Sequence, residues 1–267
     1  MSRIRKRPLA ELLSMQYPEY DRERLLAFIA CRNVKVDAHV CTDPKANFNE
    51  DAQVNLVFDQ YVSRGGFKLA HALDAWHISV QDLVMLDAGA STGGFTDCLL
   101  QRGARLVHAV DVGYNQLDWT LRTDARVVVH ERQNIMTLQS LDPIPVAAVA
   151  DLSFRSIRNA ARHLFELISG PWAICLVKPQ FEVDKALAGF TGVVTDTAVL
   201  RDTLLGVHAT LESEGIGLRD VVESPIRGRK GNREFLALLS RQPVLDHDGF
   251  AQLVERLLTV SEHLPQE

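Results

Sequence analysis

Apolar and polar positions follow two different periodicities along the chain. In the first 60 residues, apolar side chains recur at helical spacing over residues 9–13 and 25–29, and they alternate with polar ones over residues 34–40 and 54–58. Asp21 precedes the second helical stretch and suits a helix N-cap. This pattern predicts a self-contained front module of two short helices followed by a small hairpin and a further strand.

After residue 62, short apolar stretches alternate with amphipathic ones, as expected for strands and helices in turn. The predicted strands cover residues 83–86, 106–110, 127–129, 146–149, 174–177, 221–222 and 235–239. The predicted helices cover residues 95–100, 116–122, 157–168 and 197–213. This alternation predicts a Rossmann-like α/β fold of about seven strands, the last one antiparallel. We therefore expect a front α+β domain at residues 1–58, a linker at 59–63 and a larger domain at 64–267.

Composition narrows the class of protein. The chain has 267 residues, 46% of them apolar and 24% charged, which indicates a globular protein rather than a disordered one. No stretch approaches the roughly 18 apolar residues of a membrane span, and Pro8 and Glu11 follow the basic start where a signal peptide needs an apolar core. The four cysteines lack CxxC spacing, which indicates buried thiols rather than a disulfide framework. These features predict a cytoplasmic protein.

The net charge of −5 argues weakly against a nucleic-acid partner when it is averaged over the whole chain. Residues 1–35, however, contain eight Lys or Arg against four Asp or Glu. A second basic cluster, "RGRK", covers residues 227–230. Local basic clusters are the electrostatic footprint of RNA-binding proteins, so the overall average hides two candidate RNA contacts.

The segment "LVMLDAGASTGGFTDCLL" at residues 83–100 reads as a buried strand, a glycine-rich loop and a helix. A phosphate-binding P-loop is excluded because Phe95 follows Gly94 where Gly-Lys-Ser/Thr would be needed. A dinucleotide site is disfavoured because Ser91 occupies the middle position of G-x-G-x-x-G, where its side chain would crowd a pyrophosphate. A nucleoside cofactor without a pyrophosphate remains, which predicts S-adenosylmethionine.

The next strands complete this predicted cofactor site. Asp111 ends the second strand, 22 residues after Gly89, where a carboxylate can accept hydrogen bonds from both ribose hydroxyls. Asn134 follows the third strand, at a position suited to the edge of the adenine. The predicted cofactor-binding residues are Asp87, Gly89, Ala90, Ser91, Thr92, Gly93, Gly94, Phe95, Asp111, Asn134 and Asp151.

Four further polar residues stand where an α/β sheet presents its chemistry. Lys68 lies just before the first strand of the larger domain, Asp151 and Lys178 each end a strand, and Glu234 begins the last strand. Because ligands of open α/β sheets bind at the carboxyl ends of the strands, we expect these four side chains to converge beside the cofactor loop.

At these residues the chain resembles a known family. The motifs "VSRGGFKL", "LDAGASTGGFTDCLL", "AVDVGYNQL", "ADLSF" and "LVKPQFEV" are similar to those of the TlyA family, ribosomal RNA 2′-O-methyltransferases with an N-terminal S4 RNA-binding domain. The resemblance implies an FtsJ-like methyltransferase domain with a Lys-Asp-Lys-Glu tetrad at Lys68, Asp151, Lys178 and Glu234. It also implies cytidines of small- or large-subunit ribosomal RNA as substrates, and ribosomal RNA or ribosomal subunits as partners.

Two segments depart from this resemblance. Some family members carry Arg-x-Trp-Val between the domains, where this chain has "DQYV" at residues 59–62. The front module resembles an S4 domain, yet it has Arg32 and Asn33 where S4 domains usually have a glycine. The first departure leaves open how the two domains communicate.

The reaction that the resemblance implies suits these residue types. A ribose 2′-hydroxyl is a poor nucleophile, so a base must accept its proton. A lysine can do this only when burial or a nearby cation favours its neutral amine. We assign Lys178 as the base and Lys68 as the neighbouring cation that positions the ribose, with Asp151 and Glu234 orienting the two lysines. No metal is expected, because the nine histidines are scattered and no ligand spacing occurs.

Basic residues of the two clusters, with the arginine of the "SRGG" motif, are the predicted RNA contacts. They are Arg3, Arg5, Lys6, Arg7, Arg22, Arg24, Arg64, Arg229 and Lys230. Two other functions compete with RNA methylation. One is a membrane-active haemolysin, a label attached to the TlyA family, and the other is a non-catalytic RNA-binding protein on a methyltransferase fold.

Overall fold

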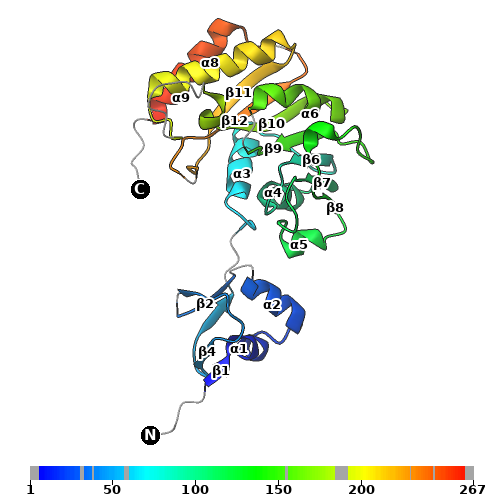
Figure 1. Cartoon of the computed structure of the whole chain (residues 1–267), viewed down its shortest axis with the longest axis vertical. Coiled ribbons are helices and arrows are strands. Elements are labelled where there is room, and N and C mark those ends of the chain that lie inside the picture. Colours follow the sequence, from blue (N-terminus) through cyan, green and yellow to red (C-terminus); the bar gives the residue numbers. More distant parts are fainter. Residues whose placement is uncertain are drawn as a thin grey trace. The chain divides into compact units, whose positions relative to one another are not determined.

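The computed structural model describes most of the chain as two compact units, Met1–Val62 and Ser63–Glu267 (Figure 1). The described residues are 6–30, 33–37, 39–56, 60–153, 156–183, 192–228, 230–242 and 244–261, without the side chains of 24, 27, 30, 260 and 261. None of the described helices is long and apolar enough to cross a membrane. Each unit has its own core and is described by itself.

The first unit is a small α+β module whose two helices pack on a three-stranded sheet. Its elements are β1 (Lys6–Pro8), α1 (Leu9–Gln16), α2 (Arg22–Ala30), β2 (Val34–Val36), β3 (His39–Val40), β4 (Asn47–Asn49) and β5 (Val54–Leu56). The antiparallel sheet has the order β3-β2-β5, and β1 pairs separately with β4. Leucines of α1 and α2 and valines of β2 and β5 form one buried cluster. The predicted helices and hairpin are therefore present.

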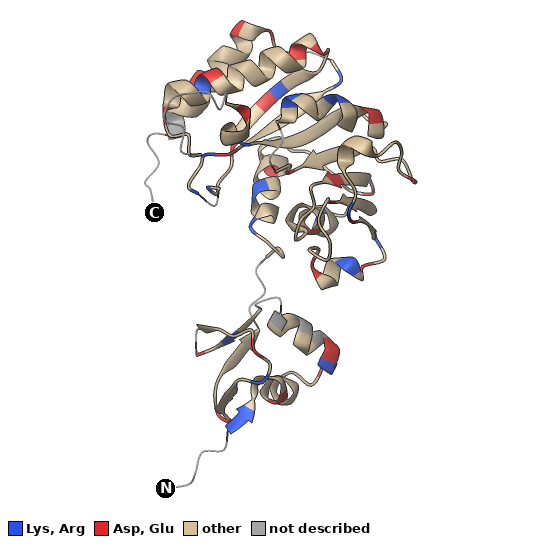
Figure 2. Cartoon of the chain, viewed as in Figure 1, with Lys and Arg blue, Asp and Glu red and all other residues tan. Residues whose placement is uncertain are grey.

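The basic start of the chain forms a strand that the sequence pattern did not predict, because Lys6 and Arg7 lie in β1 (Figure 2). Strand β1 forms through pairing with β4, about 40 residues further along the chain, with Lys6 opposite Asn49. No local periodicity could indicate this pairing.

The second unit is a seven-stranded sheet between two layers of helices. Its strands are β6 (Val84–Ala88), β7 (Leu106–Val110), β8 (Val127–His130), β9 (Ala147–Ala150), β10 (Trp172–Val177), β11 (Gly217–Glu223) and β12 (Phe235–Ser240). Their order is β11-β12-β10-β9-β6-β7-β8, and β12 alone runs in the direction opposite to the other six strands. This confirms the predicted Rossmann-like class and its antiparallel last strand.

Helices cover both faces of this sheet, and successive side chains of a strand face them in turn. The helical segments are α3 (Gly65–Ala75), α4 (Gly94–Gln101), α5 (Trp119–Arg122), η1 (Ile135–Thr137), η2 (Ile157–Asn159), α6 (Ala161–Leu167), α7 (Pro179–Glu182), α8 (Thr197–Ser213) and α9 (His247–Ser261). Leu86 and Ala88 of β6 face one buried cluster, which α6, α8 and α9 complete. Asp87, between them, faces α4 on the opposite side and contacts Thr96.

Two features of this arrangement position the candidate site. The chain passes from β6 to β7 on one side and, later, to β9 on the other, so the strand order reverses between β6 and β9. A crevice forms at such a switch point, beyond the carboxyl ends of the strands. Because β12 is antiparallel, its amino end meets the carboxyl ends of β9 and β10, and this brings Glu234 to the same edge.

Candidate active site

A cavity of about 770 Å³ opens at this edge of the sheet. Its lining comes from the loops after β6, β9 and β10, the start of α3 and the segment before β12. The lining residues are Ser63, Arg64, Gly65, Lys68, Gly89, Ala90, Ser91, Thr92, Gly94, Phe95, Gln116, Asp151, Ser153, Lys178, Gln180, Phe181, Gly192, Gly228, Lys230, Asn232 and Glu234. All four predicted tetrad residues and most of the predicted glycine loop are among them. The volume falls in the range of small-molecule sites.

The glycines of the loop permit close backbone approach at the switch point. Gly89 has φ +83°, and a Cβ there would lie 2.6 Å from the carbonyl oxygen of Asp151. A Cβ on Gly94 would lie 2.2 Å from Ser63 Oγ and 2.9 Å from the backbone nitrogen of Gly66. The start of α3 therefore packs directly on the start of α4, and the "SRGG" and "STGG" motifs form one structural unit.

The amino end of α4 faces the cavity without a capping side chain. Its N-cap is Gly93, at φ +97°, which has no side chain to accept a hydrogen bond from the first turn. Gly94 and Phe95, the first helical residues, line the cavity. Backbone N–H groups at a helix start favour an anionic ligand group, so this end of the cavity suits a carboxylate.

Asp111 holds the neighbouring loop in shape rather than lining the cavity. Its carboxylate accepts hydrogen bonds from the backbone N–H groups of Ser91 (2.9 Å) and Gly113 (2.6 Å). Ser91 has φ +50°, a left-handed conformation that this hydrogen bond helps to maintain. Each carboxylate oxygen retains acceptor capacity for a ribose hydroxyl. The ribose-binding role of Asp111 stays a prediction.

Asp87 and Asn134 also lie outside the cavity lining. The Asp87 carboxyl is fully buried; Oδ2 accepts a hydrogen bond from Thr96 Oγ1 at 2.6 Å, and Oδ1 has no hydrogen-bond partner among the described residues. Burial raises the pKa of Asp87 to about 7, helped by the charges of Asp151 and Asp111. Asn134 is the N-cap of η1 and accepts a hydrogen bond from Met136 N at 3.1 Å. Both predicted cofactor contacts remain untested.

The tetrad residues form two lysine–carboxylate pairs. Lys178 Nζ lies 2.5 Å from Asp151 Oδ1 and donates a hydrogen bond to Ser153 Oγ at 3.4 Å. Lys68 donates to Glu234 Oε2, although these two residues are 166 positions apart in sequence. Gly228 allows the second pair to form, because a Cβ there would lie 2.5 Å from Glu234 Oε1. The tetrad thus supplies the cavity with two lysine ammonium groups, each with its own carboxylate.

Comparison with known proteins identifies the family of this fold and site. The sequence profile of the FtsJ-like methyltransferases matches residues 61–241, which include the whole cavity lining. The chain belongs to the FtsJ-like methyltransferase family. The match covers more than half of the chain and falls almost entirely in the second unit.

Relatives of this FtsJ-like methyltransferase extend the similarity to the first unit. The 16S/23S rRNA (cytidine-2′-O)-methyltransferase TlyA of Mycobacterium tuberculosis is 38% identical over 246 residues, 89% of this chain and 92% of that protein. A provisionally named rRNA methyltransferase of Bacillus subtilis, YqxC, is 46% identical over 181 residues, 66% of this chain and 64% of that protein. A solved structure of a provisionally named hemolysin from Streptococcus thermophilus is 33% identical with a TM-score of 0.69, covering 98% of this chain and all of that one.

The predicted RNA contacts are spread over both units of the FtsJ-like methyltransferase. Arg64 and Lys230 are exposed and line the cavity. Lys6 and Arg22 are exposed in the first unit, whereas Arg7 is held by Glu50 at 2.8 Å and Glu11 at 3.4 Å. Arg3, Arg5 and Arg229 lie outside the described residues, as does the side chain of Arg24. Arg7 is therefore less available to RNA than its neighbour Lys6.

Several residues that shape the site escaped sequence reasoning because isolated acids and amides carry no spacing signal. The buried Glu182 carboxylate accepts hydrogen bonds from Ser156 Oγ at 2.5 Å and Ile157 N at 2.8 Å, so it joins the loops after β9 and β10. Burial raises the pKa of Glu182. Asn232 holds the segment before β12, because its side chain bonds Val194 N and Gly192 O, each at 2.9 Å. Among the described residues, no three His, Cys, Asp or Glu side chains gather as metal ligands.

Proposed function

We propose that this FtsJ-like methyltransferase transfers a methyl group from S-adenosylmethionine to the ribose 2′-hydroxyl of a cytidine in 16S or 23S ribosomal RNA, or in both. The main observation is that two lysine–carboxylate pairs meet an uncapped glycine loop in one cavity. The printed name of the M. tuberculosis relative, which matches nearly the whole chain, supports the cytidine and the ribosomal RNA.

The residues present fit S-adenosylmethionine. When bound, this cofactor supplies an electrophilic methyl group on a sulfonium sulfur. The N–H groups of Gly94 and Phe95 would receive its carboxylate, and Asp111 would accept from its ribose hydroxyls. Gly89 lets the glycine loop pass close to the end of β9, because any side chain there would collide with the backbone of Asp151.

Lys178 is the proposed base. Its amine must be neutral to accept the 2′-hydroxyl proton, and Asp151, 2.5 Å away, orients it and stabilises the ammonium that results. Phe181 lies beside this lysine, with its ring centroid 5.8 Å from Nζ, and both line the cavity. Lys68, fixed by Glu234, provides a second cation that would position the ribose.

The RNA is proposed to bind outside the cavity through exposed basic residues of both units. Arg64 and Lys230 lie at the cavity and would contact phosphates next to the target nucleotide. Lys6 and Arg22 would add contacts from the first unit, which resembles an S4 domain. Such contacts position RNA but carry no base specificity, so they do not choose the cytidine.

The test is transfer of a labelled methyl group to isolated small and large ribosomal subunits, followed by mapping of the labelled nucleotide. A 2′-O-methyl group blocks alkaline cleavage at its own nucleotide, whereas a base methyl group does not. Label at an alkali-resistant cytidine supports the proposal. Label on a base, or no transfer to either subunit or to naked ribosomal RNA, overturns it. Leakage assays on lipid vesicles, run in parallel, test the activity that the hemolysin name of one relative suggests.

A further inference from the structure

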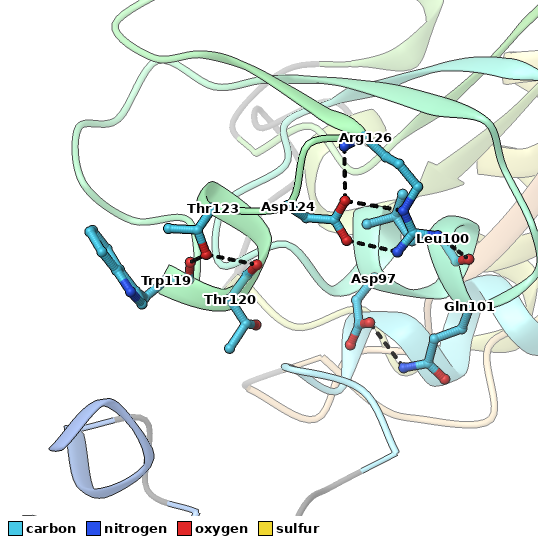
Figure 3. A network of polar contacts seen from close by, with 8 residues as sticks. All are labelled: Asp97, Leu100, Gln101, Trp119, Thr120, Thr123, Asp124 and Arg126. Carbon is cyan, nitrogen blue, oxygen red and sulfur yellow. Dashed lines mark hydrogen bonds and ion pairs between the residues drawn. The ribbon is translucent and has the colours of Figure 1, made fainter. Parts of the chain in front are cut away.

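Exposed apolar side chains gather in one short segment beside the cavity. Seven large hydrophobic side chains are exposed among the described residues, and three of them, Val112, Tyr114 and Trp119, lie within eight positions. Tyr114 is 65% exposed and Trp119 50%. In Figure 3 the indole of Trp119 points away from the polar network around it. Two flat aromatic surfaces are therefore presented to solvent by the segment between β7 and β8.

Polar contacts hold this segment in place. Asp118 caps α5 by accepting hydrogen bonds from the backbone N–H of Thr120 at 2.8 Å and from its hydroxyl at 2.7 Å. The Thr123 hydroxyl donates to the Trp119 carbonyl at 2.9 Å (Figure 3). The Glu131 carboxylate accepts from the backbone N–H groups of Asn115 and Gln116 and pairs with Arg122. A ring on a fixed backbone loses little conformational entropy when a ligand stacks on it.

The same segment is joined directly to the cavity. Asp118 N donates a hydrogen bond to the Thr92 carbonyl at 3.2 Å, and both Thr92 and Gln116 line the cavity. Tyr114 and Trp119 lie on either side of Gln116 in sequence. The segment that carries both rings therefore reaches the cavity wall at Gln116 and is fixed to it at Thr92.

A cation completes the surface. The Arg132 guanidinium lies over the Tyr114 ring, 4.1 Å from its centroid, and Arg132 makes no ion pair with any described residue. Arg132 has φ +53°, a backbone conformation uncommon outside glycine. Exposed aromatic rings with an adjacent unpaired arginine match the chemistry of unstacked nucleobases and their phosphates. If this surface bound an apolar face of another protein, the arginine would not be required.

We propose that Trp119 and Tyr114 form a stacking platform for unpaired bases of the RNA that flank the target nucleotide. The proposal rests on the proposed function for the identity of the polymer. The proposed contact does not involve the basic residues that were predicted to bind RNA. It depends on unpaired bases of the RNA rather than on the charge of its phosphates.

The experiment compares two substitutions of one side chain in the full chain. Trp119→Phe keeps a flat ring, and Trp119→Leu keeps apolar surface without one. The probe is a short single-stranded oligocytidylate, with binding followed by fluorescence anisotropy. We expect Trp119→Leu to lower affinity about 5- to 100-fold and Trp119→Phe to lower it much less. Ile144→Ala, at another exposed apolar position of the same unit, is the matched control and should change nothing.

Three results would overturn the platform. The first is equal affinity of Trp119→Leu and wild type for the oligonucleotide. The second is an equal loss of oligonucleotide affinity in the Leu and Phe variants. The third is a loss of affinity only for assembled ribosomal subunits, which would indicate a protein partner. Cofactor affinity, measured by calorimetry, should be the same in all variants, and a selective loss there would assign the ring to the cofactor instead. If wild type methylates no ribosomal RNA, the proposed function fails, while the oligonucleotide arm still decides the stacking.

Discussion

The two lysine–carboxylate pairs of the cavity differ in how the chain assembles them and in how deeply they are buried. Lys178 and Asp151 follow neighbouring parallel strands, β10 and β9, and their side chains are 11% and 27% exposed. Lys68 and Glu234 come from helix α3 and from the start of the antiparallel strand β12, with side chains 11% and 5% exposed. The first pair is a product of strand register, and the second depends on the completed tertiary fold.

This difference indicates that the first pair acts on the substrate and that the second pair stabilises the fold. The more open pair, with Ser153 and Phe181 beside it, faces the space that a substrate would fill. The more buried pair joins two elements that are far apart in sequence, the first helix and the last strand of the second unit. Loss of one member of a buried pair leaves an uncompensated charge, which destabilises a protein far more than loss of an exposed pair. The pairs should therefore respond differently to the same kind of substitution.

The largest expected effect is on chemistry at the more open pair. Lys178→Ala should lower methyl transfer about 10²- to 10⁴-fold, the usual contribution of a general base, with little change in stability. Lys178→Arg keeps the positive charge but cannot act as a base, so it should be as inactive. Single-turnover transfer and calorimetric cofactor binding are the measurements. Near-normal transfer by Lys178→Ala with intact cofactor binding would remove Lys178 from the mechanism.

The next effect is on folding at the more buried pair. Glu234→Leu should destabilise the second unit by about 3–5 kcal/mol, because the Lys68 ammonium would stay buried without a partner. The double variant Lys68→Met with Glu234→Leu should recover most of this stability but little activity. Denaturant unfolding measures the first quantity and methyl transfer the second. If Glu234→Leu were no less stable than Asp151→Leu, the contrast between the pairs would be wrong.

Asp87 sharpens the comparison because it is a buried carboxyl without a cationic partner. Its pKa rises from 3.8 to about 7 on folding, so the native state holds a proton that the unfolded chain releases. The resulting stabilisation is fully present below pH 3.8 and is lost as pH rises through 7, at most about 4 kcal/mol. Asp87→Asn does not titrate, so the difference in unfolding free energy between wild type and variant should change over this range. A pH-independent difference would contradict the shift.

The smallest effect distinguishes a paired from an unpaired cation in the first unit. Lys6 makes no ion pair with a described residue, whereas Arg7 is held by two glutamates. Lys6→Ala should weaken ribosomal RNA binding several-fold and lower the slope of log affinity against log salt by about one. Arg7→Ala should change binding less. Filter binding over a salt series measures the affinity and its slope. Equal slopes for wild type, Lys6→Ala and Arg7→Ala would exclude Lys6 as a phosphate contact.

Strand ends were the most predictable part of this molecule. Asp151 and Lys178 follow apolar strands, and parallel strands place such residues at one edge of the sheet. Helix α3, which carries Lys68, gave no clear signal, because Gly65 and Gly66 disfavour a helix when it is considered alone. Their small size is what allows the close packing on Gly94. The helix is therefore stabilised by a tertiary contact that local periodicity cannot indicate.

Contacts made by single acidic residues were beyond prediction for a related reason. Helix α5 begins at Trp119 rather than at residue 116, because Asp118 caps it and Glu131 binds the N–H groups of Asn115 and Gln116 in a loop. Glu131 lies after a strand and looks like an ordinary surface acid in the sequence. Its partners lie in the loop after β7 and in helix α5, and they meet Glu131 only in the folded unit.

The pairing of Lys68 with Glu234 also has a consequence during synthesis. A ribosome makes Lys68 and the glycine loop early, and a chain that has reached residue 200 already contains the proposed base. It still lacks the strand that supplies the partner of Lys68. The complete set of four side chains can therefore assemble only after the last strand has emerged and folded, so the protein can be catalytically active only once its sheet is complete.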